Sequence, residues 1–155
     1  MNTVAFLAIA VGLTAAQTAT AQRPANVQMI YMGGSDCPPC VRWRASELPK
    51  LQQSEIFRSI TFTYVQKPIA GTVPPALFLP AEARPYKDQM DAASGGMGGS
   101  PQVAVIVDGH LYDYYFGVRN AEAVEQMIQA IRTDRKYPFD RCVRRDRSRA
   151  CLVKG

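Results

Sequence analysis

The sequence predicts an α/β fold in which helices cover both faces of a mixed sheet. Segments that favour strands lie at residues 27–32, 60–65 and 102–107, and helical patterns separate or follow them. A strand–helix–strand unit implies a right-handed crossover between parallel strands. A tight-turn signal after the third strand adds an antiparallel partner. The expected order is therefore a βαβ unit, a helix, a hairpin of two strands and a last helix.

The first half of the chain supplies the βαβ unit. Residues 27–32 form a short apolar run before two glycines, which favours a strand. A helical pattern begins at Pro38, and Pro49 should kink or end that helix. Its apolar positions are Val41, Trp43, Ala45, Leu48 and Leu51. Residues 60–65 alternate apolar and hydroxyl side chains and predict the second strand, whereas the proline-rich residues 67–80 should be irregular.

The second half of the chain supplies the remaining elements. They are a helix over 81–93, a glycine-rich loop over 95–99, strands over 102–107 and 111–116, and a helix over 121–133. Pro85 should disturb the first turns of the earlier helix. Asp108-Gly109 predicts the tight turn that joins the two strands. Asn120 is expected to cap the last helix.

The N-terminal segment indicates export. Residues 4–16 are an apolar stretch of thirteen residues, shorter than the about 20 that span a bilayer but typical of a signal-peptide core. Ala19-Thr20-Ala21 matches a small-x-small cleavage site, so a signal peptide is expected over residues 1–21. An uncleaved N-terminal anchor is the alternative. The expected location is the bacterial periplasm, where disulfides persist.

Chain length and charge indicate one domain with a basic tail. The expected division is a domain over residues 22–135 and a tail over residues 136–155. The net charge of +5 is unevenly distributed: the segment from Arg132 onward has a charge of +6, and the rest of the chain has a charge of −1. We interpret this cluster as solvated surface, with weak contact to an anionic membrane or an acidic partner as the alternative. We expect a monomer, because no strongly apolar exposed face is evident, and no nucleic-acid partner.

The motif Cys37-Pro38-Pro39-Cys40 carries most of the chemical information. Two thiols three positions apart at a helix start can switch between dithiol and disulfide without large backbone motion. Unpaired helix N–H groups and the helix dipole favour a thiolate at the first sulfur. Prolines suit the first helical positions, where no N–H partner is lost. The motif predicts redox chemistry; a structural disulfide and half of a zinc site are the alternatives.

The other two cysteines predict a structural bridge. A Cys142–Cys151 disulfide would close a ten-residue loop and stabilise the tail by about 2–3 kcal/mol. A second redox pair that relays electrons to the first is the alternative. No metal ligands are assigned: His110 is expected to be a solvated turn residue, and Met90 and Met97 alone make a weak soft-metal signal.

Taken together, residues 27–133 resemble the thioredoxin-fold family. The resemblance rests on the strand that leads into the two-proline motif, on Gly99-Ser100-Pro101 before a strand, on the hairpin and on the last helix. It implies a thioredoxin-like three-layer sandwich with a cis bond before Pro101. It also implies that Cys37 is an exposed attacking thiolate, that Cys40 is the buried resolving thiol, and that Ser100 and Pro101 contact substrate.

The chain departs from that family at two positions near the motif. Asp36 stands where thioredoxins carry a tryptophan, and the strand around Tyr31 lacks their buried acid. The predicted function is nevertheless an exported thiol–disulfide oxidoreductase that needs no cofactor. Its expected partners are protein thiols or disulfides and an unidentified redox protein. A redox-inactive binding module with the same fold and a metallochaperone are the alternatives.

Overall fold

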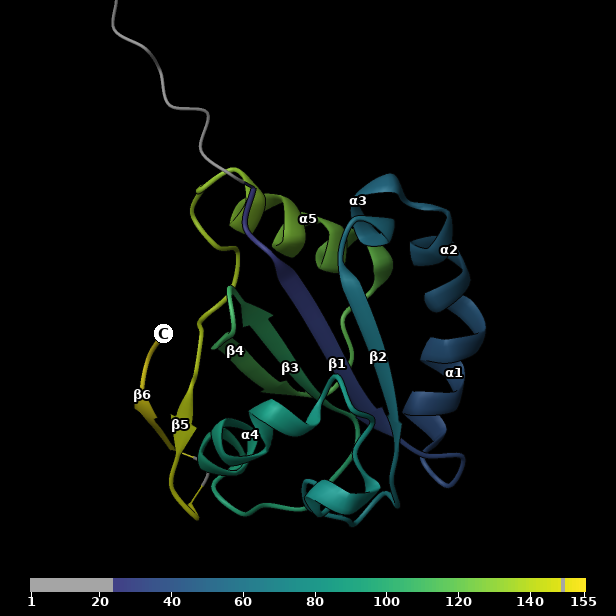
Figure 1. The fold of residues 1–155 in the computed structure, drawn as a ribbon. Coiled ribbons are helices and arrows are strands. Elements are labelled where there is room, and N and C mark those ends of the chain that lie inside the picture. The colour runs from purple at the N-terminus through teal and green to yellow at the C-terminus, as the bar shows by residue number, and fades with distance from the viewer. Residues whose placement is uncertain (1–23, 149) are drawn as a thin grey trace, which may run out of the picture.

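The computed structural model describes residues 24–148 and 150–155, so the expected signal peptide lies outside the described residues. A four-stranded mixed sheet in the order β2-β1-β3-β4 forms the middle of the molecule (Figure 1). Its strands are β1 (Val27–Gly33), β2 (Thr61–Gln66), β3 (Gln102–Val107) and β4 (His110–Phe116). β1 pairs with β2 in parallel and with β3 antiparallel, and β3 pairs antiparallel with β4. The expected α/β class and mixed sheet are confirmed.

Helices pack on both faces of this sheet. They are α1 (Pro38–Ser46), α2 (Leu48–Gln53), α3 (Glu55–Arg58), α4 (Lys87–Ser94) and α5 (Ala121–Arg132), with short 3-10 helices η1 (Ala76–Phe78) and η2 (Arg84–Tyr86). Successive side chains of β1 point to opposite faces. Met29 and Tyr31 therefore join the core beneath α1, α2, α3 and α5, whereas Ile30 and Met32 join the core beneath α4. Burial on both faces explains why β1 is mostly apolar, and its one amide side chain, Gln28, is buried with hydrogen bonds to Thr63 and Glu82.

Local signals placed the turn and the last helix correctly. Asp108 and Gly109 both have positive φ, 48° and 85°, as the tight turn between β3 and β4 requires. The Asn120 side chain accepts a hydrogen bond from the Ala123 N–H at 2.9 Å and caps α5. The predicted break near Pro49 is also present, because α1 ends at Ser46 and Pro49 lies in the first turn of α2.

The helices and the tail show three details beyond the predicted elements. The helix expected over 81–93 is α-helical from Lys87, and Pro85 lies in the 3-10 turn η2, so the predicted disturbance of its first turns is confirmed. Val41, one of the apolar positions of the first predicted helix, is 42 % exposed. The tail forms a small sheet of β5 (Arg144–Arg145) and β6 (Cys151–Val153) beside α4, which the sequence did not predict.

The tail is closed by its own disulfide and joined to the domain by polar contacts. The predicted Cys142–Cys151 disulfide is present. The Tyr114 N–H of β4 donates to the Cys142 carbonyl at 3.0 Å, and Arg145 donates to the Ala93 carbonyl of α4 at 3.2 Å. The tail therefore packs as part of the same body as the sheet.

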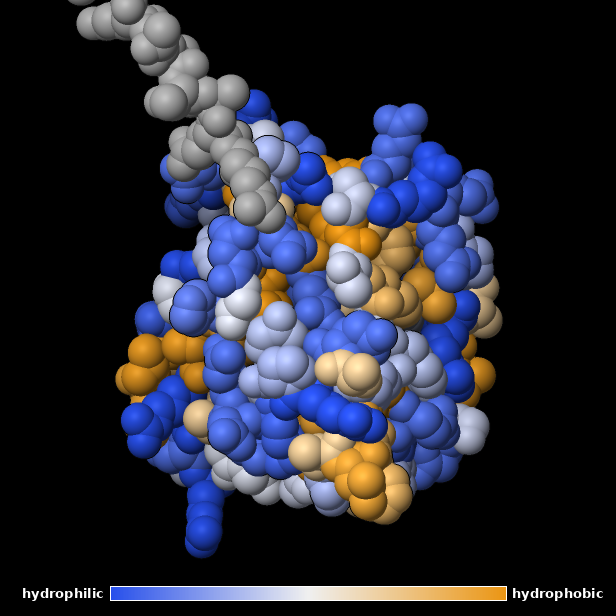
Figure 2. Space-filling model, in the orientation of Figure 1, coloured by the Kyte–Doolittle hydropathy of each residue, from blue (hydrophilic) through white to orange (hydrophobic). Residues whose placement is uncertain are grey.

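The surface carries one apolar feature that was not expected. Leu77 and Phe78 of η1 are 79 % and 72 % exposed. Apolar surface gathers at the lower edge of the molecule in Figure 2, where the teal η1 turn lies in Figure 1. Within residues 24–148 and 150–155, no helix is both long and apolar enough to cross a bilayer.

Candidate functional site

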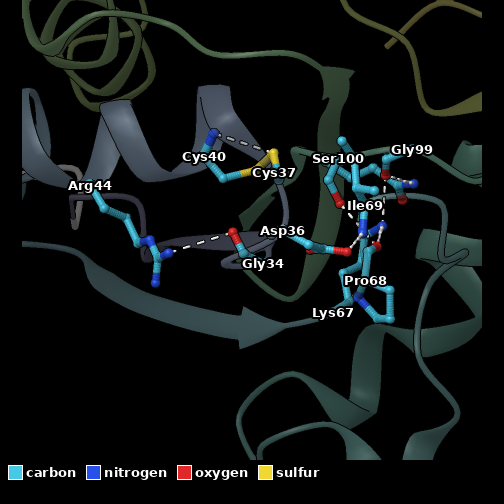
Figure 3. Close-up of a disulfide and its surroundings, with 12 residues drawn as sticks. Gly34, Asp36, Cys37, Cys40, Arg44, Lys67, Pro68, Ile69, Gly99 and Ser100 are labelled. Carbon is cyan, nitrogen blue, oxygen red and sulfur yellow. Dashed lines mark hydrogen bonds between the residues drawn. A yellow bond between two sulfur atoms is a disulfide. The ribbon is translucent and has the colours of Figure 1, made fainter.

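The sheet brings the two predicted site segments to the same edge. Because β1 and β3 are antiparallel, with Met32 opposite Gln102, the end of β1 lies beside the start of β3. Cys37 follows β1 after a short turn, and Ser100-Pro101 directly precedes β3. The peptide bond between Ser100 and Pro101 is cis, as the family resemblance implied. Figure 3 draws Cys37 and Ser100 together with the residues of this region.

The two-proline motif forms a disulfide at the start of α1. Cys37 and Cys40 are bonded, and Cys37 is the N-cap residue whose sulfur accepts a hydrogen bond from the Cys40 N–H at 3.2 Å. Pro38 and Pro39 occupy the first two helical positions, where a missing N–H removes no helical bond. In the reduced state a Cys37 thiolate at this place would be stabilised by the helix dipole and by the same N–H.

The expectation of an exposed Cys37 is wrong for the disulfide state, because Cys37 and Cys40 are both 0 % exposed. The irregular chain after β2 packs against this edge. The Asp36 carboxylate accepts a hydrogen bond from the Ile69 N–H at 2.9 Å. The Ser100 hydroxyl donates to the Pro68 carbonyl at 3.4 Å. Residues 67–71, called here the covering segment, thus bridge from the neighbour of Cys37 to Ser100 (Figure 3).

The buried Lys67 side chain bonds the covering segment to the loop before β3. Lys67 is 2 % exposed. Its ammonium group donates to the carbonyls of Gly71 at 2.5 Å, Gly99 at 2.6 Å and Pro68 at 3.5 Å. Burial lowers the pKa of Lys67 to about 8, and the nearby Asp36 charge partly opposes that effect. Lys67 is therefore largely protonated at neutral pH, so all three of its donors are available to these carbonyls.

Close backbone approach also fixes the covering segment. A Cβ atom on Gly98 would lie 2.2 Å from the Ala70 carbonyl oxygen, and one on Gly34 would lie 2.4 Å from the Lys67 carbonyl oxygen. Only glycine allows these contacts without a shift of the backbone. The sequence predicts only a loop at 95–99, but one of its glycines, Gly98, also allows the backbone of the covering segment to pack closely against the loop.

Aromatic side chains support the inner cysteine. A Cβ atom on Gly33 would lie 2.8 Å from Cys40 Sγ and 3.0 Å from Tyr31 Cε1, so the sulfur and the phenol ring lie on the same side of Gly33. Tyr31 stacks on Trp43 with ring centroids 4.4 Å apart. Burial raises the pKa of the Tyr31 hydroxyl well above its usual range. Tyr31 thus supplies apolar packing near Cys40.

The buried Tyr31 hydroxyl yields a test of this packing. It has no hydrogen-bond partner among the described residues. Replacement of Tyr31 by phenylalanine should therefore raise the free energy of unfolding by about 1 kcal/mol, because an unsatisfied buried hydroxyl is removed. Urea unfolding followed by circular dichroism measures the change. Tyr64→Phe is the matched control: its hydroxyl donates to the Gly33 carbonyl at 2.8 Å, so its removal should destabilise the protein. Equal destabilisation by both variants would contradict the prediction.

Other candidate residues lie apart from the disulfide. His110 is exposed at the start of β4, and Met90 is fully buried in the core beneath α4. Arg44 points toward the Gly34 carbonyl and the Tyr64 ring rather than toward Cys37 (Figure 3). Within residues 24–148 and 150–155, no three His, Cys, Asp or Glu side chains lie close enough together to hold a metal ion.

Sequence reasoning missed Lys67 and the tail residue Arg145 as parts of the site. A lysine directly after a strand usually lies in solvent, and nothing local indicates that Lys67 is buried against Gly99.

No protein-family model matches the chain, and no curated protein sequence matches it either.

Proposed function

We propose that this chain is an exported thiol–disulfide oxidoreductase with a thioredoxin-like fold. The observation that carries the proposal is the Cys37–Cys40 disulfide at the N-terminus of α1, beside Ser100-Pro101 at the same sheet edge. The strand order and the helices on both sheet faces support the thioredoxin-like arrangement.

The exchange step would proceed through a mixed disulfide. A substrate thiolate attacks Cys37 Sγ, a substrate–Cys37 disulfide forms, and Cys40 leaves as a thiolate. A second substrate thiolate then displaces Cys37, so the substrate dithiol is oxidised and the cysteine pair takes up two electrons and two protons. Both steps run in reverse when the reduced pair meets a substrate disulfide. Because Cys37 is buried, part of the surrounding chain must move before either step. The covering segment is the part we propose to move, because it bonds to Asp36 beside Cys37 and to Ser100.

A redox titration tests this proposal. The purified protein is equilibrated in glutathione buffers of defined ratio, with and without a metal chelator, and each cysteine is scored by alkylation and mass spectrometry. Reversible conversion of Cys37–Cys40 to the dithiol, at a ratio where Cys142–Cys151 stays oxidised, is the expected result. Copper or zinc bound in stoichiometric amounts and lost to the chelator would favour a metallochaperone.

The complete burial of Cys37 and Cys40 favours a second candidate function. In a redox-inactive binding module with this fold, the disulfide would be structural and would resist reduction. The same titration separates the two candidates. A pair that stays oxidised at every glutathione ratio would contradict the oxidoreductase and support the binding module.

The covering segment gives a further prediction for reactivity. Lys67→Met keeps the aliphatic stem but removes the hydrogen bonds to Pro68, Gly71 and Gly99. The loss should destabilise the bonded arrangement of the covering segment by about 1–2 kcal/mol. If this segment must move away before the disulfide reacts, the rate of disulfide reduction by a phosphine should increase about 5- to 30-fold. Lys50→Met, on an exposed side chain of α2, is the matched control. An unchanged rate in the Lys67 variant would show that this segment does not limit access.

A further inference from the structure

A cavity of about 220 Å³ opens beside the cis peptide bond. Its lining comes from three separate parts of the chain: the 97–101 loop, the end of β4 and the tail. The residues on which the argument depends are Met97, Ser100, Pro101, Phe116 and Arg145. The cavity therefore joins the segment proposed to contact substrate to a basic side chain of the tail.

Arg145 is a half-buried cation that forms no direct ion pair within the described part of the chain. One of its guanidinium nitrogens donates to the Ala93 carbonyl at 3.2 Å, and the group lies 5.7 Å from the Phe116 ring centroid. Within residues 24–148 and 150–155, no carboxylate lies within ion-pair distance of it. Burial lowers the pKa of Arg145, and the charge of Asp113 partly opposes that effect. A partly desolvated guanidinium with spare donors is suited to bind a carboxylate.

The position of Arg145 is fixed by the fold of the tail. β5 pairs with β6, and the Cys142–Cys151 disulfide ties the two sides of this small sheet together. The tail backbone also lies tightly against the 95–99 loop, because a Cβ atom on Gly95 would meet the Asp146 carbonyl oxygen at 2.6 Å. The Arg145 backbone is thus held beside the loop that leads to Ser100-Pro101, and the Ala93 carbonyl orients its guanidinium.

We propose that this cavity receives an acidic side chain of the protein substrate, close to the substrate cysteine that exchanges with Cys37. The inference rests on the proposed function and names its substrate class. Arg145 is the specificity-determining residue: its free N–H groups bind the carboxylate, while Met97 and Phe116 contact the aliphatic part of the side chain. The positive charge of the surrounding tail attracts acidic partners over longer distances.

Charge-matched peptides test this inference. Three short peptides each contain one cysteine and differ only at its neighbour, which is glutamate, glutamine or lysine. Each reduces Cys37–Cys40 through the mixed disulfide, and the rate is normalised to that peptide's reaction with glutathione disulfide, which corrects for the acidity of its thiol. The wild-type protein should react roughly 5- to 10-fold faster with the glutamate peptide than with the glutamine peptide, as expected for one charge-assisted contact.

Variants separate the cavity from the general charge of the tail. Arg145→Gln should abolish the preference for glutamate, and Arg145→Lys should retain part of it, because lysine keeps the charge but not the planar fork. Arg144→Gln removes the same charge from the exposed neighbour in β5 and should leave the preference intact. Mass analysis checks that each variant retains the Cys142–Cys151 disulfide, and circular dichroism with urea unfolding checks that it retains the fold.

The possible failures are distinguishable. Equal rates for the three peptides with the wild-type protein would overturn the inference alone. Equal loss of preference in the Arg144 and Arg145 variants would assign the effect to diffuse charge and would also overturn it. No reaction with any peptide would contradict the proposed function itself, and the inference with it.

Discussion

Replacing Cys37 by serine is expected to abolish thiol–disulfide exchange while leaving the fold intact. Cys37 is the residue whose sulfur lies at the N-terminus of α1, where the Cys40 N–H contacts it. A serine hydroxyl can keep this capping role but cannot form a mixed disulfide. The variant should completely lose its catalysis of insulin disulfide reduction by dithiothreitol. The assay measures the turbidity of the insulin chains that precipitate after reduction.

Two further variants sharpen this test. Cys40→Ser should still attack substrate but should trap the mixed disulfide, which mass spectrometry detects as a covalent adduct on Cys37. The double variant Cys142→Ser, Cys151→Ser should keep exchange activity, because the tail disulfide is expected to be structural. Undiminished insulin reduction by the Cys37→Ser protein would defeat the oxidoreductase assignment.

Among the substitutions proposed here, Asp113→Ala is expected to lower the free energy of unfolding most. Asp113 of β4 is 0 % exposed, and its carboxylate accepts hydrogen bonds from the Tyr137 hydroxyl at 3.0 Å and the Cys142 N–H at 3.1 Å. It also forms an ion pair with Arg119 at 3.4 Å. The Arg119 guanidinium is itself enclosed, with the ring centroids of Tyr115 and Phe139 at 3.6 and 3.7 Å.

Removal of this carboxylate leaves several buried groups without partners. The Arg119 charge loses its counter-ion, and two donors from the tail lose their acceptor. The expected loss is about 3–5 kcal/mol, a large part of the 5–15 kcal/mol that stabilises an ordinary domain. Urea unfolding measures it. Because Asp113 joins β4 to residues 137 and 142, cleavage by trypsin within the tail should also become faster.

Two controls keep this prediction specific. Asp113→Asn retains one acceptor oxygen without the charge and should lose less stability than the alanine variant. Asp140→Ala, on an exposed carboxylate of the tail, should change stability by less than about 0.5 kcal/mol. A loss below about 1 kcal/mol in Asp113→Ala would mean that the hydrogen bonds and ion pair of Asp113 do not hold the tail in place.

The sequence was most informative where structure depends on neighbouring residues. The turn at Asp108-Gly109, the cap at Asn120 and the break near Pro49 each follow from local backbone geometry. The short spacing of Cys37 and Cys40 at a helix start likewise allowed the disulfide to be predicted.

Pattern reasoning failed where a distant segment decides the environment of a residue. Cys37 was expected to be exposed because the motif and its helix predict a sulfur at a helix tip. Cys37 is nevertheless buried. The covering segment, which begins about thirty residues further along the chain, bonds to its neighbour Asp36 and to Ser100. No periodicity in residues 67–80 indicates that contact.

The sequence by itself therefore determined the strands, the last helix, the hairpin and both cysteine pairings, because these depend on short-range geometry and spacing. Only the tertiary structure decided that Cys37 is covered, that Lys67 is buried, and that Arg145 of the tail reaches the cavity beside Pro101. The physical reason is that burial and pairing of a charge depend on which remote backbone packs against it. That packing is determined by the whole core.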